Sequence, residues 1–211
     1  MQEIDVRYTA KIPVQARSKA RFNEIILAAE ALVIEIVIDQ VSPHKIAKRA
    51  GIPPASVYQY FPSLGALFST MAEIHFIKAF DMVEERIAEK NISNWQDLIL
   101  ILVDVAYDFY TQDKISETLF LSNVVAPGVR ELSATRLTRV GNYFADKFAI
   151  IHKKSELKGL PEKIAICIEV MKGVYIRSLS VHGEIKANYK NEARILILGY
   201  LDEFFSSLPK K

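Results

Sequence analysis

The sequence predicts an all-α protein, with an N-terminal domain of three helices followed by a C-terminal domain of six helices. Apolar residues recur at three- and four-residue spacing along most of the chain, which is the periodicity of an amphipathic helix. Prolines, glycines and serines between residues 42 and 68 stand where they begin and end short helices. We expect the two domains to be 1–62 and 63–211, joined by a continuous helix from Ser63.

The N-terminal arm and first helix carry the excess of positive charge. Residues 1–61 contain eight Lys or Arg and six Asp or Glu, whereas the rest of the chain contains nineteen of each. We expect residues 1–16 to form an arm that either contacts phosphates or is a solvated tail. A helical stripe predicts the first helix over residues 17–36. The β-branched segment 34–41 would suit a strand in isolation, and we assign it to the end of this helix and the following turn.

Residues 42–61 contain two short helices separated by a tight corner. Ser42 can cap a helix that starts at Pro43 and stops at Gly51. Pro54 can then open a second helix, which Pro62 ends. Two helices of about two turns joined through a glycine are typical of a helix-turn-helix motif.

The composition of this motif suits contact with a nucleic acid. Between Ser42 and Phe61 there are three cationic side chains and no acidic one, and the second helix carries hydroxyl and amide groups that can bond phosphates or base edges. An αα-hairpin with a solvated charged face would give the same pattern. The side chains concerned are Lys45, Lys48, Arg49, Ser56, Tyr58, Gln59 and Tyr60.

The run from Ile46 to Phe68 resembles the DNA-binding domain of the TetR family of transcriptional regulators, and residues 25–33 resemble that family's first helix. The resemblance covers about residues 17–70. The positions in step with the family pattern are Ile46, Ala47, Ala50, Gly51, Ile52, Ala55, Ser56, Val57, Tyr58, Tyr60, Phe61, Ser63 and Leu67. The family usually has Ser or Thr in place of Pro53, Lys in place of Leu64, and Gly in the region of Val37.

The resemblance implies a role for eight residues of the motif. Ser42 and Tyr60 are expected to contact phosphates, with Ser56 and Tyr58 nearby. The residues expected to reach base edges are His44, Lys45, Ala55 and Gln59. Two such motifs in a dimer would dock into successive major grooves of a pseudo-palindromic operator.

Six further helices are expected after Ser63, over about residues 64–90, 95–112, 115–125, 131–153, 161–182 and 188–208. Ser93 is a plausible cap for the helix that begins at Trp95. The last two helices carry wide apolar stripes, so we expect a homodimer through residues 161–208. Leu201 and Phe204 are the residues expected in that interface. Packing of both helices within one chain is the alternative.

A pocket for a small, largely apolar effector is expected inside the C-terminal domain, since methionine and aromatic side chains suit such a ligand. The same side chains could instead fill the core. The candidate lining residues are Met71, His75, Leu102, Phe109, Tyr143 and Met171.

The sequence gives no pattern typical of an enzyme. It has no glycine-rich phosphate loop, paired cysteines, HExxH or GxSxG motif, so no catalytic residue, metal or cofactor is expected. With one cysteine, Cys167, and no apolar run of about 20 residues, a cytoplasmic protein is expected. We therefore predict a ligand-responsive transcriptional regulator, with repression as the expected action. The alternatives are a regulator of the same fold without an effector, and an all-α enzyme, which salt-dependent binding to duplex DNA would exclude.

Overall fold

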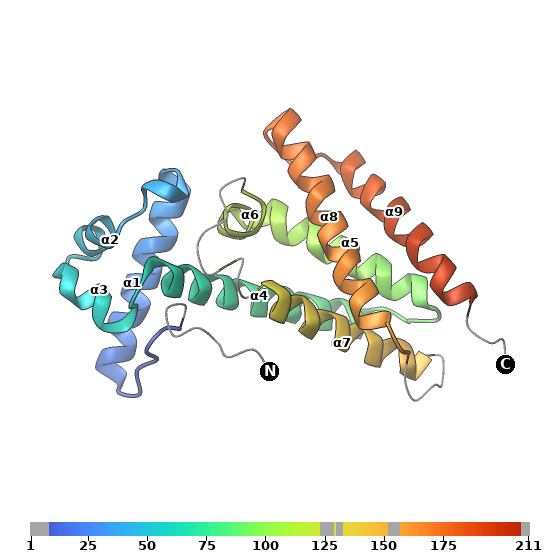
Figure 1. Cartoon of the computed structure of the whole chain (residues 1–211), viewed down its shortest axis with the longest axis horizontal. Coiled ribbons are helices and arrows are strands. Elements are labelled where there is room, and N and C mark those ends of the chain that lie inside the picture. The colour runs from blue at the N-terminus through green and yellow to red at the C-terminus, as the bar shows by residue number, and fades with distance from the viewer. Residues whose placement is uncertain (1–8, 123–128, 130–132, 152–156, 208–211) are drawn as a thin grey trace. The chain divides into compact units, whose positions relative to one another are not determined.

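The computed structural model describes residues 9–122, 129, 133–151 and 157–207. Within this part of the chain every regular element is a helix, which confirms the all-α prediction (Figure 1). None of the described helices has a segment both long and apolar enough to span a membrane. The α-helices are α1 (Ala16–Glu35), α2 (Pro43–Ala50), α3 (Pro54–Tyr60), α4 (Leu64–Glu89), α5 (Trp95–Gln112), α6 (Lys114–Leu121), α7 (Ser133–Ile151), α8 (Leu160–His182) and α9 (Ala187–Ser206).

The chain folds into two compact units. Unit 1 comprises Met1–Ile77 and Lys114–Leu132, and unit 2 comprises Lys78–Asp113 and Ser133–Lys211. Helix α4 therefore contributes its first half to unit 1 and its second half to unit 2. Helix α6 packs with the N-terminal helices as part of unit 1, an assignment that the local periodicity of the sequence does not contain.

Unit 1 is built around the buried face of α1. This helix packs against α2 and α6, and α2 packs against α3. Phe22 of α1 lies 4.7 Å from Phe61 between ring centroids, and its edge meets Tyr60 at 6.0 Å. Ile25 and Ile46 are fully buried beside them. Burial of these apolar groups is the main stabilising term for so small a domain.

The short helices of unit 1 begin and end where the sequence predicts. The Ser42 hydroxyl accepts a hydrogen bond from the Lys45 N–H at 3.3 Å, and Gly51 ends α2 with a positive φ of 64°. The Ser63 hydroxyl accepts from the Ala66 N–H at 3.0 Å at the start of α4. Each cap satisfies backbone groups that a helix end otherwise leaves unpaired.

The β-branched segment after α1 is not a strand. Helix α1 ends at Glu35, and Ile38–Gln40 form a short 3-10 helix, η2. Ile38 and Val41 are buried in the core of unit 1, whereas Val37 is exposed. The apolar side chains of this segment therefore serve the packing of α1 on α2 and not a sheet.

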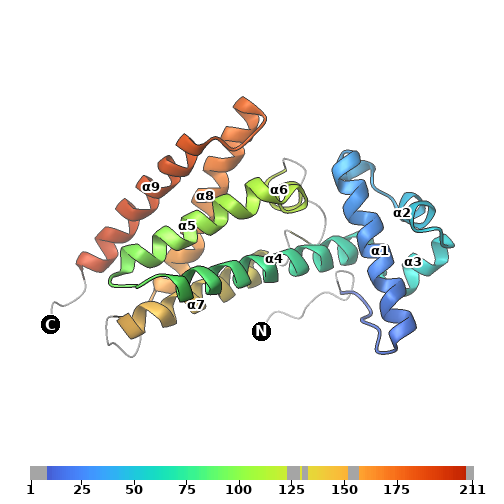
Figure 2. The same cartoon turned by 180° about the vertical axis from the view of Figure 1, so that it is seen from behind.

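Unit 2 is a bundle in which α8 packs against α7 and α9, and α5 packs against α9 and α7. Both views show α8 and α9 side by side (Figures 1 and 2). Trp95 at the start of α5 stacks on Phe205 near the end of α9, with ring centroids 4.6 Å apart. Gly141 of α7 allows a close approach of the start of α8, because a Cβ there would lie 2.3 Å from the Pro161 carbonyl oxygen.

The helix boundaries in unit 2 follow the predicted ones with small differences. The cap of α5 is Asn94 and not Ser93: Asn94 accepts from the Asp97 N–H at 2.9 Å, while the Asp97 carboxylate accepts from the Asn94 N–H at 3.2 Å. This reciprocal pairing satisfies more backbone donors than a serine one residue earlier could. The predicted helix ends near residues 125, 153 and 208 lie outside the described residues.

Candidate nucleic-acid interface

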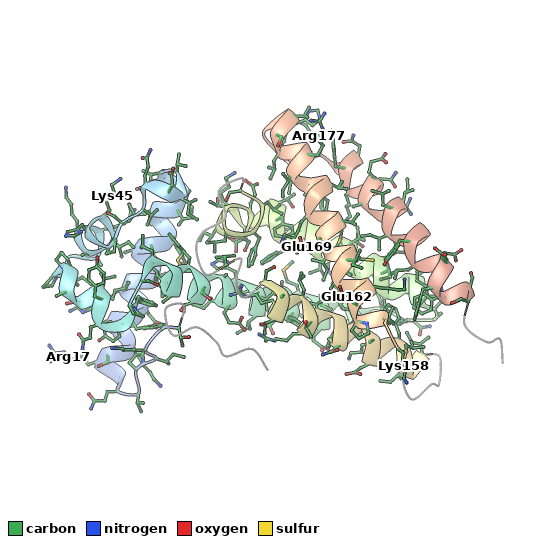
Figure 3. The ribbon with its side chains drawn as sticks, in the orientation of Figure 1. Arg17, Lys45, Lys158, Glu162, Glu169 and Arg177 are labelled. Carbon is green, nitrogen blue, oxygen red and sulfur yellow. The ribbon has the colours of Figure 1, made fainter. Side chains whose placement is uncertain are left out.

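Helix α2 places apolar residues inward and charged residues outward. Ile46 and Ala47 are buried against the core, whereas His44 and Lys45 are exposed near the first turn. Figure 3 shows Lys45 projecting away from the ribbon of α2. The first turn of α2 has no acidic residue. The outer surface of α2 therefore presents positive charge to the solvent.

One of the three cations of this motif has a partner within unit 1. Arg49 donates from Nη1 to Glu35 Oε2 at 2.5 Å, which joins the end of α2 to the end of α1. Both side chains are largely exposed, so the pair contributes little to stability. Lys45 and Lys48 make no ion pair with a described residue, and both are exposed. These two lysines are the cations that the motif can offer to a phosphate.

Helix α3 presents the side chains that suit base contacts. Ala55, Tyr58 and Gln59 are exposed, Ser56 is half-buried, and Val57 holds the helix to the core. Tyr58 is 48% exposed, an unusual value for an aromatic side chain in a packed domain. An amide and a methyl group on the exposed face of a short helix can contact base edges in a major groove, and a phenol beside them can donate to a phosphate.

Pro53 and Leu64 change the two ends of this region. Pro53 stands at the cap of α3 and supplies no side-chain hydrogen bond; its carbonyl accepts from the Ser56 N–H at 2.9 Å instead. Leu64 at the start of α4 is half-buried and packs against the core of unit 1. The turn and the helix start are thus preserved. The hydroxyl and the ammonium that the TetR pattern usually has at the positions of Pro53 and Leu64 are absent.

Tyr60 is the most buried of the eight predicted DNA-binding residues, at 8% exposure. Its ring packs edge-on against Phe22. The ring belongs to the core of the domain, so any contact with a phosphate is restricted to its hydroxyl group. The other seven predicted residues are exposed or half-buried on α2, its cap and α3.

Comparison with known proteins identifies this domain. Residues 25–71 match the family described as bacterial regulatory proteins, tetR family. The N-terminal domain is therefore similar to the DNA-binding domain of the TetR family. The match begins within α1 and ends within α4, so it covers the helix-turn-helix motif and the helices that support it.

The whole chain has the fold of TetR-family transcriptional regulators. It is similar to a TetR-family regulator from Streptomyces coelicolor, with a TM-score of 0.66 and 21% identity over 89% of this chain and 98% of that chain. A TetR transcriptional regulator from Rhodococcus sp. RHA1 gives a TM-score of 0.55 and 19% identity, over 92% of this chain and 100% of that chain. The structure of RolR in complex with the ligand resorcinol gives a TM-score of 0.66 and 14% identity, over 92% of this chain and 97% of that chain. No curated protein matches the chain in sequence.

The six residues predicted to line an effector pocket fall in both units of this TetR-type fold. Met71 and His75 lie in unit 1, whereas the other four lie in unit 2. All are buried except Tyr143, which is half-buried. Two hollows that described residues of α7 and α8 line in unit 2 contain none of these six residues.

His75 has structural partners on both ring nitrogens. Its Nε2 lies 3.0 Å from Glu30 Oε1 of α1, and its Nδ1 lies 3.1 Å from the Ser116 hydroxyl of α6. His75 is 1% exposed and Ser116 is fully buried. A neutral imidazole protonated on Nε2 donates to Glu30 and accepts from Ser116. The sequence predicts His75 as a lining residue of an effector pocket; in the structure it joins α1, α4 and α6.

Unit 2 contains a cluster of three phenols, of which Tyr110 and Tyr175 are buried and Tyr107 is half-buried. The Tyr107 and Tyr110 rings of α5 lie 6.3 and 6.2 Å from the Tyr175 ring of α8. Tyr175 is fully buried, and its hydroxyl has no hydrogen-bond partner among the described residues. Burial raises the pKa of Tyr175 and of Tyr110 above the ordinary range, so both phenols stay protonated at neutral pH.

Charged side chains surround this phenol cluster. Asp104 of α5 accepts from Lys190 of α9 at 2.6 Å and lies 3.8 Å from Lys90. Asp108 accepts from Arg86 at 2.6 Å, and this hydrogen bond raises the pKa of the guanidinium. These pairs fasten the ends of α4 and α9 to α5. Among the described residues no group of His, Cys, Asp and Glu could hold a metal ion.

Cys167 lies in the core of unit 2 at 1% exposure. Burial raises the pKa of its thiol to about 12, although the nearby Lys163 ammonium opposes the shift. A thiol with that pKa is almost entirely protonated at neutral pH and is a poor nucleophile. Cys167 therefore serves as a small apolar side chain.

Proposed function

We propose that this protein is a cytoplasmic transcriptional repressor that binds a pseudo-palindromic DNA operator as a homodimer. The observation that carries this proposal is the surface of α2 and α3. It offers exposed Tyr58 and Gln59 beside two lysines of α2 that make no ion pair with a described residue, in a domain that matches the tetR family model. Phosphate contacts would fix the orientation of the domain, and the α3 side chains would discriminate between sequences.

Selection of bound duplexes from a random pool tests this proposal. We expect an enriched sequence with two related half-sites, because a two-fold dimer repeats each contact. Gln59→Ala should reduce discrimination at one position of each half-site by about 1–3 kcal/mol. Tyr60→Phe retains the ring that packs on Phe22 and should weaken binding to all sequences alike. Equal loss on every duplex for both variants would contradict this division of roles.

The proposed dimer rests on a second apolar face of α8 and α9. Their inner faces fill the core of unit 2, where Ile164, Met171 and Ile197 are buried. Their outer faces expose large aliphatic side chains at helical spacing, which a monomer seldom leaves uncovered. The exposed outer residues are Ile166 (39%), Val170 (37%), Val181 (47%), Ile195 (53%) and Leu196 (51%).

Two glycines on these outer faces support the same interface. Gly173 lies three residues after Val170 on α8, and Gly199 lies three residues after Leu196 on α9, so each glycine shares a helix face with that exposed side chain. Both are exposed, and a Cβ at either position would meet no atom within 4 Å in its own chain. Glycine within a helix costs about 1 kcal/mol relative to alanine. Close approach of a partner helix would explain why both positions lack a side chain.

Leu201 does not belong to this interface. It is fully buried in the core of unit 2, so the prediction that it lies between subunits is wrong. Phe204 is half-buried, and its ring lies beside Lys163 and Phe205. The sequence could not separate the inner from the outer face, because α9 carries apolar residues on both.

We further propose that a small, largely apolar effector binds in unit 2 and releases the operator. Leu102, Phe109, Tyr143 and Met171 remain the candidate lining residues, and the Tyr175 hydroxyl is a buried donor that a ligand could satisfy. A buried polar group without a partner costs about 1–3 kcal/mol, which a bound oxygen atom would recover. RolR was solved with resorcinol, so small phenols are the first compounds to test.

A regulator without an effector is the alternative for this part of the proposal. It is favoured by the burial of Leu102, Phe109 and Met171, since the same side chains can fill the core. Screening the protein with small phenols separates the two. A rise in melting temperature together with operator release supports an effector, and no change in either property supports the alternative.

A further inference from the structure

The described part of the N-terminal arm is held beside the end of α3. The Lys11 N–H donates a hydrogen bond to the Tyr60 carbonyl at 2.8 Å. Tyr60 is the last residue of α3, and the final carbonyls of a helix have no partner within the helix. Ala10 packs against the core of unit 1 next to this bond. The arm is therefore anchored at the helix that presents Gln59.

A surface groove separates the arm from α3. Its volume is about 420 Å³, and it opens to solvent. One wall comes from the arm and the start of α1, and the other comes from the last two residues of α3. We call it the arm groove, and its lining residues are Lys11, Ile12, Pro13, Val14, Gln15, Ser18, Gln59 and Tyr60.

The arm groove combines positive charge with exposed apolar side chains. Residues 9–20 include Lys11, Arg17 and Lys19 and no acidic residue. All three cations are exposed, and none makes an ion pair with a described residue. Figure 3 shows Arg17 projecting from the start of α1. Ile12 is 80% exposed and Val14 is 87% exposed on the rim of the groove.

The start of α1 adds to this electrostatic character. Its first turn contains no acidic side chain, and the cap residue Gln15 makes no side-chain hydrogen bond to the helix. The first N–H groups of a helix are unpaired within it, and they carry partial positive charge. An anionic strand that enters the arm groove would meet these donors together with the Lys11 ammonium.

We propose that the arm groove binds the sugar–phosphate backbone of the operator strand next to the bases contacted by α3. Lys11 would pair with a phosphate, while Ile12 and Val14 would cover a deoxyribose. Duplex DNA is the occupant because Gln59 belongs both to the groove and to the reading surface of α3. Because Gln59 and the arm line the same groove, a backbone beside the bases at Gln59 would lie next to the arm. This inference rests on the proposed function.

The salt dependence of operator binding tests the inference. Each phosphate contact contributes about −0.9 to the slope of log K against log salt. One Lys11 contact in each subunit would therefore make the slope of Lys11→Gln less steep than wild type by about two. The sequence preference in the random-pool selection should stay unchanged, since phosphate contacts carry no direct sequence information. Lys11→Arg should keep the wild-type slope.

Two controls make the result specific. Lys158→Gln removes an equally exposed cation of unit 2 and should leave the slope unchanged. The Lys11→Gln melting temperature should match wild type, because the backbone bond to Tyr60 is retained. If the wild type fails to bind any duplex, the proposed function is wrong. If the wild type binds and Lys11→Gln has the same slope, only the arm groove is excluded.

Discussion

At the scale of single residues, the most informative side chain is His75. The sequence predicts an interior position for His75, as a candidate lining residue, and in the structure its side chain is 1% exposed. The sequence does not indicate the partners, because Glu30 and Ser116 are 45 and 41 positions away. A buried imidazole must satisfy two nitrogens, and here both are used to join three helices of unit 1.

Replacing His75 should destabilise the protein without touching the DNA-binding surface. His75→Phe keeps a ring in the core but removes both hydrogen bonds, leaving Ser116 and Glu30 without this partner. We expect the free energy of unfolding to fall by about 1–3 kcal/mol for each buried group affected. Urea denaturation followed by circular dichroism measures the loss.

Two further variants show whether the loss of stability comes from the hydrogen bonds of His75. Adding Ser116→Ala to His75→Phe should cost less than Ser116→Ala alone, because the hydrogen bond between the two side chains is already absent. His182→Phe changes an exposed histidine at the end of α8 and should alter stability by less than about 0.5 kcal/mol. A His75→Phe protein as stable as wild type would show that the two hydrogen bonds contribute nothing net.

At the scale of elements, the short helices were the most predictable part of the chain. Ser42, Gly51 and Ser63 define helix ends by local chemistry alone, and each acts as predicted. The packing of α6 onto α1 was not predictable, because its periodicity indicates a buried face but not the helix that covers it. The same distinction applies to the candidate site. Exposed residues such as Gln59 could be predicted from the sequence, whereas the burial of Tyr60 could not, because it depends on packing against Phe22.

The two faces of α9 lead to a prediction about assembly. Leu196 is 51% exposed on the outer face, so Leu196→Glu should leave the core intact and place a carboxylate in the proposed dimer interface. We expect a folded monomer with much weaker operator binding, because a monomer loses the second half-site. Analytical ultracentrifugation at micromolar concentration and operator titration measure the two effects.

A matched substitution on the inner face separates assembly from folding. Leu201→Ala opens a cavity in the core of unit 2 and should lower the free energy of unfolding by about 2–5 kcal/mol. It should remain dimeric at temperatures where it is folded. The proposed interface is excluded if Leu196→Glu stays dimeric, or if the wild-type chain is itself a monomer.

At the scale of the whole molecule, α4 belongs to both units, with Ile77 in unit 1 and Lys78 in unit 2. A ligand can change operator affinity only when it binds the DNA-bound and DNA-free states with different affinities. Preferential binding to the DNA-free state must weaken the operator complex, and the operator must weaken ligand binding by the same factor. If the ligand weakened operator binding but the operator did not weaken ligand binding, or the reverse, the ligand would not be an effector of this kind.

This reciprocity gives the final prediction, which concerns Leu102. Leu102 is 6% exposed on α5, so Leu102→Trp should fill any space beside it and abolish the rise in melting temperature caused by a bound phenol. Overpacking costs about 1–3 kcal/mol, so the variant must first be shown to be folded and to bind the operator. Leu102→Met, which nearly conserves volume, should keep the ligand response. Isothermal titration of each variant with and without operator measures both directions of the coupling. A full ligand response in Leu102→Trp would place the effector away from α5. If Leu102→Trp does not fold, the ligand response of Leu102→Met still tests for an effector, and the absence of that response would contradict the prediction.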